Sequence, residues 1–289
     1  MEHPLELPEL DVLALLRANH INPKKGLGQN FLLDPVALRR IITAAEIPEN
    51  STVLEIGAGL GSLTRYLARA AQKVVAVELD AELFPVLKQV LANDQNVTLV
   101  KGDILKLQPA VLVDQPGYLV VANIPYYITS NLIRHLLEAS IKPSRMVLTV
   151  QREVAERICA KPGDLSLLAL SVQVYGLPKL VGQIPAGAFY PSPKIDSTIV
   201  RVDLYPQPLI PAEDLDRFFR LAKAGYSQKR KTMRNALSGG LAWPPARVVE
   251  LLQAAGIDPQ RRAETINLAE WNDLTALASD IAPGAAKPE

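Results

Sequence analysis

Several features that are common in secreted and membrane proteins are scarce or missing in this sequence. Cys159 is the only cysteine, so the chain cannot form an internal disulfide, and a reducing compartment suits it. No apolar run approaches the roughly 20 residues that span a bilayer. The acidic, proline-containing N-terminus does not resemble a secretion signal. We therefore expect a cytoplasmic protein with no membrane partner.

An excess of charge of either sign is also missing. The sequence has 31 basic and 30 acidic residues and a net charge of +1, with an isoelectric point near 7.8. This balance argues against a protein that binds nucleic acid over its whole surface, so any such contact must come from a local patch. The three histidines, His3, His20 and His135, are scattered, and we interpret them as surface residues. We expect no metal.

The length and the pattern of the chain predict a large α/β domain followed by a small one. A chain of 289 residues with 48% hydrophobic residues can form a core for both. From residue 52 onward, short β-branched runs alternate with amphipathic stretches, as in βαβ units around a parallel sheet. The predicted strands are seven runs, at 52–54, 74–77, 97–100, 119–121, 146–150, 168–174 and 198–204.

A linker separates the two predicted domains. Residues 205–211 contain three prolines, which cannot propagate a helix or strand. Beyond them the pattern is helical, at 214–224, 227–237, 245–255 and 267–281. The predicted organisation is an N-terminal extension at 1–21, a large domain at 22–205, a linker at 206–211, a small helical domain at 212–281 and a disordered tail at 282–289.

A glycine-rich turn follows the first predicted strand of the large domain. The run Gly57-Ala58-Gly59-Leu60-Gly61 stands where the chain passes from strand to helix, which favours close approach to a small cofactor. Close packing of the helix on the strand would require the same glycines. Taken alone, the turn therefore leaves both interpretations open.

Carboxylates at the next two strand ends strengthen the cofactor interpretation. Glu78 ends the second strand about 20 residues after Gly57, the spacing of an acid that accepts hydrogen bonds from ribose hydroxyls. Asp103 follows the third strand and could accept from an adenine amine. Each acid alone could be a surface carboxylate, but open α/β sheets bind ligands at this edge.

These motifs, followed by Asn123-Ile124-Pro125-Tyr126 after the fourth strand, resemble the Rossmann-like S-adenosylmethionine-dependent methyltransferases. Within that group, Gly28-Gln29-Asn30-Phe31-Leu32 resembles a segment that closes over the cofactor in the ribosomal RNA adenine dimethyltransferase family. The resemblance implies a seven-stranded, mostly parallel sheet and S-adenosyl-L-methionine as the methyl donor. The residues that we assign to the cofactor are Gln29, Asn30, Leu32, Gly57, Gly59, Glu78, Asp103, Ile104 and Asn123.

Three residues are predicted to handle the target base. The exocyclic amine of adenine is a poor nucleophile because its lone pair is delocalised, so acceptors must engage its N–H bonds. Asn123 can accept one of them and a backbone carbonyl in the Ile124-Pro125 turn the other, while Tyr126 offers a stacking face. Phe189 could equally anchor its loop in the core. The resemblance favours a second stacking face, so we assign Asn123, Tyr126 and Phe189 to the chemical site.

A basic stretch in the small domain predicts a nucleic-acid partner. From Arg217 to Arg234 the chain has no Asp or Glu among seven basic residues, whereas a solvated helix face would mix the two signs. The residues that we assign to RNA binding are Lys223, Lys229, Arg230, Lys231 and Arg234.

The resemblance continues at 224–237 and 256–264 with the small-subunit branch of the same family. It implies as substrate two adjacent adenines of small-subunit ribosomal RNA, each methylated twice while the subunit assembles. We expect a monomer. Two alternatives stay open from the sequence. One is a large-subunit methyltransferase of the macrolide-resistance type, and the other is a non-catalytic ribosome-assembly factor with the same fold.

Overall fold

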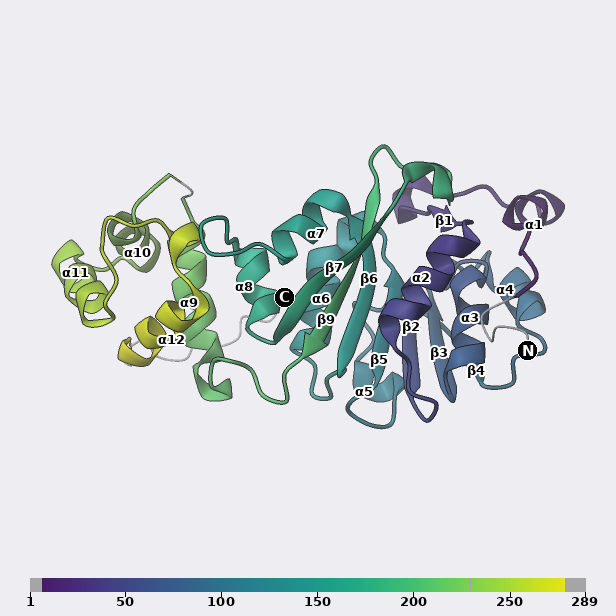
Figure 1. Ribbon diagram of the computed structural model, residues 1–289, viewed down its shortest axis with the longest axis horizontal. Coiled ribbons are helices and arrows are strands. Elements are labelled where there is room, and N and C mark those ends of the chain that lie inside the picture. Colours follow the sequence, from purple (N-terminus) through teal and green to yellow (C-terminus); the bar gives the residue numbers. More distant parts are fainter. Residues whose placement is uncertain (1–6, 229, 279–289) are drawn as a thin grey trace. The chain divides into compact units, whose positions relative to one another are not determined.

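A computed structural model describes residues 7–228 and 230–278 (Figure 1). In this part of the chain, no helix is both long enough and apolar enough to cross a membrane. The tail predicted at 282–289 and the basic residue Lys229 lie outside the described residues.

The chain divides into two compact units. The first comprises the chain up to Ala155 together with Pro178–Leu204, and the second comprises Glu156–Leu177 and the chain from Tyr205 onward. The second unit therefore includes a segment that we assigned from the sequence to the large domain. The other predicted boundaries stay predictions.

A seven-stranded sheet forms the centre of the first unit, in the order β4-β3-β2-β5-β6-β9-β7 within the described residues. Its strands are β2 Thr52–Ile56, β3 Lys73–Glu78, β4 Val97–Lys101, β5 Leu119–Asn123, β6 Arg145–Gln151, β7 Gly176–Ile184 and β9 Ser197–Leu204. Neighbours from β4 to β6 are parallel, and β9 runs antiparallel to β6. The predicted α/β fold with a mostly parallel sheet is confirmed.

Helices flank this sheet, with α2 in front of it and α6 behind it in Figure 1. Within the described ranges, the first unit contains six α-helices before β6. They are α1 Val12–Ala18, α2 Pro35–Ala45, α3 Ser62–Ala70, α4 Phe84–Val90, α5 Pro109–Leu112 and α6 Thr129–Leu137. α7, Arg152–Ile158, follows β6 directly. A separate two-stranded ribbon pairs β1, Phe31–Leu32, with β8, Phe189–Tyr190.

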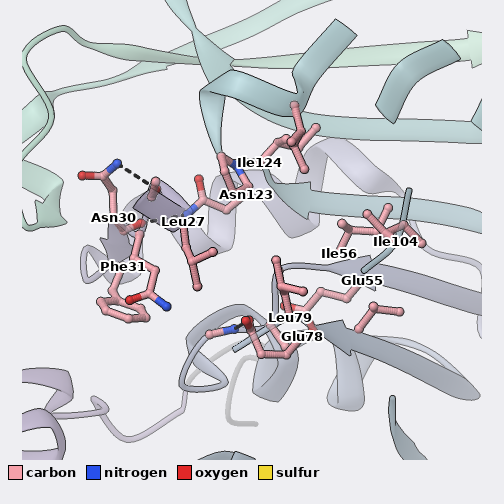
Figure 2. Close-up of a pocket in the computed structure, with 18 of the residues that line it drawn as sticks. Leu27, Asn30, Phe31, Glu55, Ile56, Glu78, Leu79, Ile104, Asn123 and Ile124 are labelled. Atoms are coloured by element: carbon pink, nitrogen blue, oxygen red, sulfur yellow. Dashed lines mark hydrogen bonds between the residues drawn. The ribbon is translucent and has the colours of Figure 1, made fainter. Parts of the chain in front are cut away.

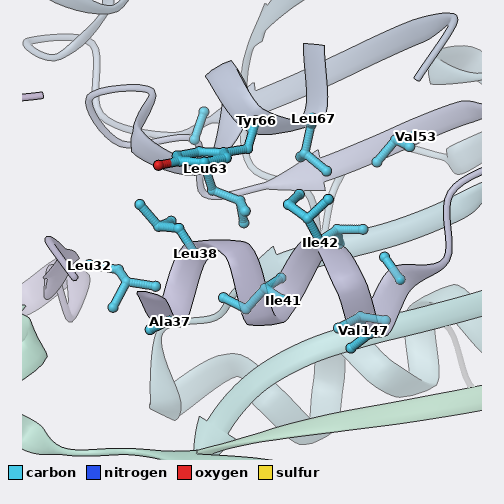
Figure 3. Packing of buried hydrophobic residues seen from close by; sticks show 14 of the residues in the cluster. Leu32, Ala37, Leu38, Ile41, Ile42, Val53, Leu63, Tyr66, Leu67 and Val147 are labelled. Atoms are coloured by element: carbon cyan, nitrogen blue, oxygen red, sulfur yellow. The ribbon is translucent and has the colours of Figure 1, made fainter. Parts of the chain in front are cut away.

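The core of the first unit follows from the sequence pattern of α2 and its neighbours. α2 begins where the Asp34 carboxylate accepts the Val36 N–H at 2.8 Å, with Pro35 in its first turn. Figure 3 shows Leu38 of α2 facing Leu63 and Tyr66 of α3, and Ile42 facing Leu67. At helical spacing, the buried residues of α2 form one broad apolar face, which packs against α3 and the strands of the sheet.

One predicted strand is wrong. The run at 168–174 forms helix α8, Leu167–Gln173, because Ser166 caps it by accepting the Ala169 N–H at 3.2 Å and its leucines and alanine favour a helix. The strand that completes the sheet is β7, which was not predicted. Pro178 and Gly182 interrupt its pattern, and a strand at the sheet edge tolerates both.

The second unit is helical. Besides α8 it contains α9 Leu215–Tyr226, α10 Met233–Leu241, α11 Pro245–Ala254 and α12 Leu268–Leu277. The helix predicted at 227–237 begins later than expected, at Met233. The preceding residues form a loop, and carbonyls of a second loop accept the first N–H groups of α10, at 2.7 Å from Met233 to Arg261 and 3.1 Å from Arg234 to Pro259.

A cluster of ion pairs ties α2 to two strands of the sheet. Arg145 of β6 and Arg201 of β9 both contact Asp203, with Nε to Oδ1 distances of 2.7 and 2.9 Å. The same two arginines donate to the last carbonyl groups of α2, and Arg201 pairs with Glu46 just beyond them at 2.6 Å. Partial burial raises the pKa of Asp203, but the hydrogen bonds from Arg145 and Arg201 outweigh it and hold that pKa below its usual value.

We predict that Asp203→Asn destabilises the protein by about 1–3 kcal/mol near neutral pH, because it leaves two partly buried arginines without their shared carboxylate. A carboxylate whose pKa is lower in the folded state stabilises that state at pH values above its unfolded pKa of about 4. This contribution is lost as the pH falls through the pKa of the folded state. Urea unfolding at several pH values measures both effects.

The matched control is Asp114→Asn, since Asp114 is 82% exposed and pairs with Lys73 at the surface. We expect little change from it. Equal losses in the two variants, or a loss for Asp203→Asn that does not shrink in acid, would contradict the role of the cluster.

Candidate functional site

The strand order reverses direction at β2. β3 and β4 lie on one side of it and β5 on the other, with Ile56 opposite Ala122 in the register of β2 and β5. Chains leaving two such strands diverge, which opens a crevice at their carboxyl ends. The glycine turn leaves β2 into this crevice, and Asn123 ends β5 beside it.

The glycine turn folds back under this crevice because its glycines adopt backbone angles that other residues avoid. Gly57 and Gly59 have φ of 78° and 59°. At Gly59 a Cβ would also lie 3.2 Å from the Phe31 ring, so the turn and β1 pack in direct contact. The main chain of the turn is thereby exposed to the crevice without side chains in the way.

Glu78 is held rigidly at the end of β3. Its Oε2 accepts the Gly59 N–H at 2.8 Å and its Oε1 accepts the Asp80 N–H at 2.7 Å. Burial raises the pKa of Glu78 against the opposing effect of these two hydrogen bonds, and the residue is 7% exposed. The carboxylate therefore presents its remaining lone pairs in a fixed direction, as recognition of a diol requires.

A pocket of about 210 Å³ occupies the crevice. In Figure 2, Asn30 and Phe31 lie on one side of it and Ile56 and Ile104 on the other, while the remaining edges carry Asn123 and Glu78. Its lining consists of apolar side chains with a few acceptors and amides, the usual make-up of a small-molecule site.

Every residue predicted to contact the cofactor lines this pocket, and so does Tyr126. Phe189 does not. It is 4% exposed and packs in the hydrophobic core with Leu32 and Leu38, whereas Tyr190 beside it is 41% exposed. The assigned roles themselves stay predictions.

Two acidic residues were missed, one beside the pocket and one in its lining. Asp80 is 4% exposed and accepts from Lys24 and Gln29, each at 2.8 Å. Glu55 lines the pocket and is 1% exposed, and its Oε2 has no hydrogen-bond partner among the described residues. Burial raises the pKa of Glu55 to about 8. A carboxyl group inside an otherwise apolar strand was the signal that could have found it.

Most of the predicted RNA-binding residues lie in the second unit as exposed cations. Lys223 is near the end of α9, Arg230 and Lys231 are in the loop that follows, and Arg234 is in the first turn of α10. None of these four has an ion-pair partner in the described ranges. Arg217, at the start of the basic stretch, pairs instead with Asp214 at 2.7 Å and is less exposed.

The sheet order, the glycine turn and the fixed carboxylate of Glu78 define the first unit as a Rossmann-like methyltransferase domain. The family model for ribosomal RNA adenine dimethylase matches residues 20–280, and the chain belongs to this family. Membership implies S-adenosyl-L-methionine as the methyl donor.

Named relatives agree with this assignment. The chain is 46% identical over 255 residues to the ribosomal RNA small subunit methyltransferase A of Dehalococcoides mccartyi, covering 88% of each chain. A crystal structure of a dimethyladenosine transferase from Plasmodium falciparum is similar, with 26% identity and a TM-score of 0.75 over 84% of this chain and 95% of that one. The 23S rRNA methyltransferase ErmE is 28% identical, with a TM-score of 0.71 over 86% and 100%.

The residues of the pocket fit this donor. Glu78 and Asp103 offer acceptors at successive strand ends, as a ribose and an adenine amine require, and the glycine turn leaves room for close approach. In the part of the chain that the structure describes, no three His, Cys, Asp or Glu side chains gather as metal ligands.

We predict that Glu78→Gln weakens binding of S-adenosyl-L-methionine by roughly tenfold to a hundredfold, because an amide has one acceptor oxygen where Glu78 uses two. Calorimetric titration with the cofactor measures the change. Glu49→Gln, at an exposed position, is the control and should bind normally. Unchanged affinity in Glu78→Gln would contradict the assignment of this carboxylate.

Proposed function

We propose that this protein transfers methyl groups from S-adenosyl-L-methionine to the exocyclic amines of two adjacent adenines in small-subunit ribosomal RNA, dimethylating each. The proposal rests on the position of Asn123, which ends β5 and lines the same pocket as Glu78 and Asp103. A hydrogen-bond acceptor for an amine thus stands beside acceptors for a nucleoside. The named relative from Dehalococcoides mccartyi supports the small subunit as the source of the RNA.

The residues around Asn123 suit recognition of an adenine amine. Its Oδ1 can accept one N–H, and main-chain carbonyls in the Ile124-Pro125 turn are the candidates for the other. Both hydrogen bonds draw the nitrogen lone pair out of conjugation with the ring and fix its direction. The bound cofactor supplies an electrophilic methyl group, and no His, Lys, Arg or Cys is among the described residues that line the pocket. The protein therefore contributes by orienting the target amine toward the methyl group.

Tyr126 supplies the stacking face for the base. It follows the turn directly, lines the pocket, and its hydroxyl lies 2.8 Å from the Ser197 Oγ, which fixes the ring. Stacking of a base on such a ring contributes about 1–3 kcal/mol. The ring of Phe189 is buried in the core, and its stacking role stays a prediction.

The second unit supplies the RNA contact in this proposal. Lys223, Arg230, Lys231 and Arg234 are exposed, and phosphate neutralisation by such cations is the main source of affinity for RNA. An assembling small subunit as substrate, a monomeric enzyme and a cytoplasmic location belong to the same proposal. The large-subunit and non-catalytic alternatives are not favoured, because the named relative is a small-subunit enzyme and the site keeps its acceptors.

The role of Asn123 can be tested by removing its side-chain amide. Asn123→Ala should lower methyl transfer about a hundredfold or more, because the target amine loses an acceptor that is fixed in place. RNA binding should persist. Transfer of labelled methyl groups to immature small subunits measures the first effect, and a gel-shift titration measures the second.

The matched control for it is Asn131→Ala, which removes an exposed amide from α6. Turnover close to wild type in Asn123→Ala would refute the hydrogen-bond role. Loss of turnover in both variants would attribute the effect to folding.

The exposed basic residues of the second unit can be tested by neutralising them. Replacing Arg230, Lys231 and Arg234 with Gln should weaken RNA binding and flatten its dependence on salt, by about 0.7–0.9 in logarithmic slope for each phosphate that the variant no longer neutralises. The control replaces three exposed cations of the first unit, Arg69, Lys88 and Lys101, and so removes the same charge. An equal slope in wild type and the first variant would rule the basic residues out.

A further inference from the structure

The segment Leu27–Leu32, here called the strap, forms one wall of the cofactor pocket and also touches the turn that carries the target-base residues. Its Asn30 carbonyl accepts a hydrogen bond from the side chain of Asn123, with 3.1 Å between Nδ2 and O. A segment assigned to the cofactor therefore makes a direct contact with the residue assigned to the amine.

This hydrogen bond decides which end of the Asn123 amide faces the substrate. A main-chain carbonyl can only accept, so the NH₂ group must be the end that points to the strap. The Oδ1 is then the end left for the target amine. Without the Asn30 carbonyl, rotation of the amide by half a turn would present N–H donors to the N–H donors of adenine, an arrangement that repels the substrate.

The position of the strap depends on Gly28. This residue has φ of 63°, and a Cβ there would lie 3.2 Å from the Pro125 Cβ and 3.3 Å from the ring of Tyr127. The main chain of the strap thus lies directly on the turn after Asn123. Any larger residue at this position is strained and also pushes the strap away from the turn.

At its other side the strap is tied to the strand end that carries Glu78. Gln29 Nε2 and Lys24 Nζ each donate to the Asp80 carboxylate at 2.8 Å, and the Asp80 N–H donates to Glu78 at 2.7 Å. Lys24 also donates its main-chain N–H to the Gln29 side chain at 2.7 Å. A continuous series of hydrogen bonds therefore links the acid assigned to the ribose with the strap.

We propose that Asn30 is a positioning residue for methyl transfer, whose main-chain carbonyl fixes the Asn123 amide with Oδ1 toward the target amine. The inference rests on the proposed function. Methyl transfer then requires the strap in the position in which it also lines the cofactor pocket. A cofactor bound without the strap in place meets an acceptor that is free to turn the wrong way.

The test compares Gly28→Ala with Gly26→Ala. A Cβ at Gly26 meets nothing within 4 Å and that residue needs no unusual backbone angle, so Gly26→Ala is a matched control outside the strap. Single-turnover methyl transfer is measured with saturating S-adenosyl-L-methionine and immature small subunits. We expect Gly28→Ala to be slower by about tenfold or more and Gly26→Ala to match wild type.

Saturating cofactor separates the positioning role from a role in cofactor binding. If Gly28→Ala binds cofactor more weakly but reaches the wild-type rate at saturation, the strap serves the cofactor alone and the proposal is overturned. Thermal unfolding identifies a variant that fails to fold.

A measurement on the unaltered protein keeps the proposal testable in that case. In nuclear magnetic resonance spectra, the side-chain NH₂ of Asn123, assigned by its absence in Asn123→Asp, should exchange slowly with water and couple through the hydrogen bond to the Asn30 carbonyl carbon. A freely exchanging NH₂ would overturn the proposal. If the wild-type protein methylates no RNA while this coupling is present, the proposed function fails and the contact itself stands.

Discussion

The pairing of β2 with β5 is the constraint on which the rest of the site depends. Because Ile56 lies opposite Ala122, the next residues on each strand, Gly57 and Asn123, emerge side by side at the carboxyl edge of the sheet. A Cβ on Gly57 would lie 3.5 Å from the Asn123 carbonyl oxygen. The turn that approaches the cofactor and the residue that would orient the acceptor base are therefore fixed relative to each other by the main-chain ladder, before any side chain contributes.

The acids and the strap complete this arrangement from opposite sides. Glu78 is immobilised by main-chain N–H groups of the glycine turn and of Asp80, and Asp80 in turn holds Gln29 of the strap. Orientation of this kind suits a transfer in which the cofactor provides the reactive group and the protein provides alignment. Preformed hydrogen bonds avoid reorganisation when the substrates bind, which is why so much of the polar surface here is already paired.

The sequence predicted those parts of the site whose chemistry lies in side chains at strand ends. Glycines, Glu78, Asp103 and Asn123 could be placed together because parallel strands bring their carboxyl ends to one edge. The contact from Asn30 could not be predicted, since any residue has a main-chain carbonyl. In the fold, the alternation of strands and helices was visible, but the apolar run at 168–174 has no periodicity that separates a buried helix from a strand, and the capping role of Ser166 was overlooked. The role of Phe189 stays a prediction, because an aromatic residue beside prolines fits a core anchor as well as a stacking face.

The central claim is that this chain dimethylates adjacent adenines of the small-subunit RNA. The most direct measurement is mass spectrometry of ribosomal RNA after incubation of the protein and S-adenosyl-L-methionine with immature small subunits and, in parallel, with large-subunit RNA. We expect N6,N6-dimethyladenine at two neighbouring positions of the small-subunit RNA and none in the large-subunit RNA. Methylation confined to the large-subunit RNA, or no methylated adenine in either, would contradict it.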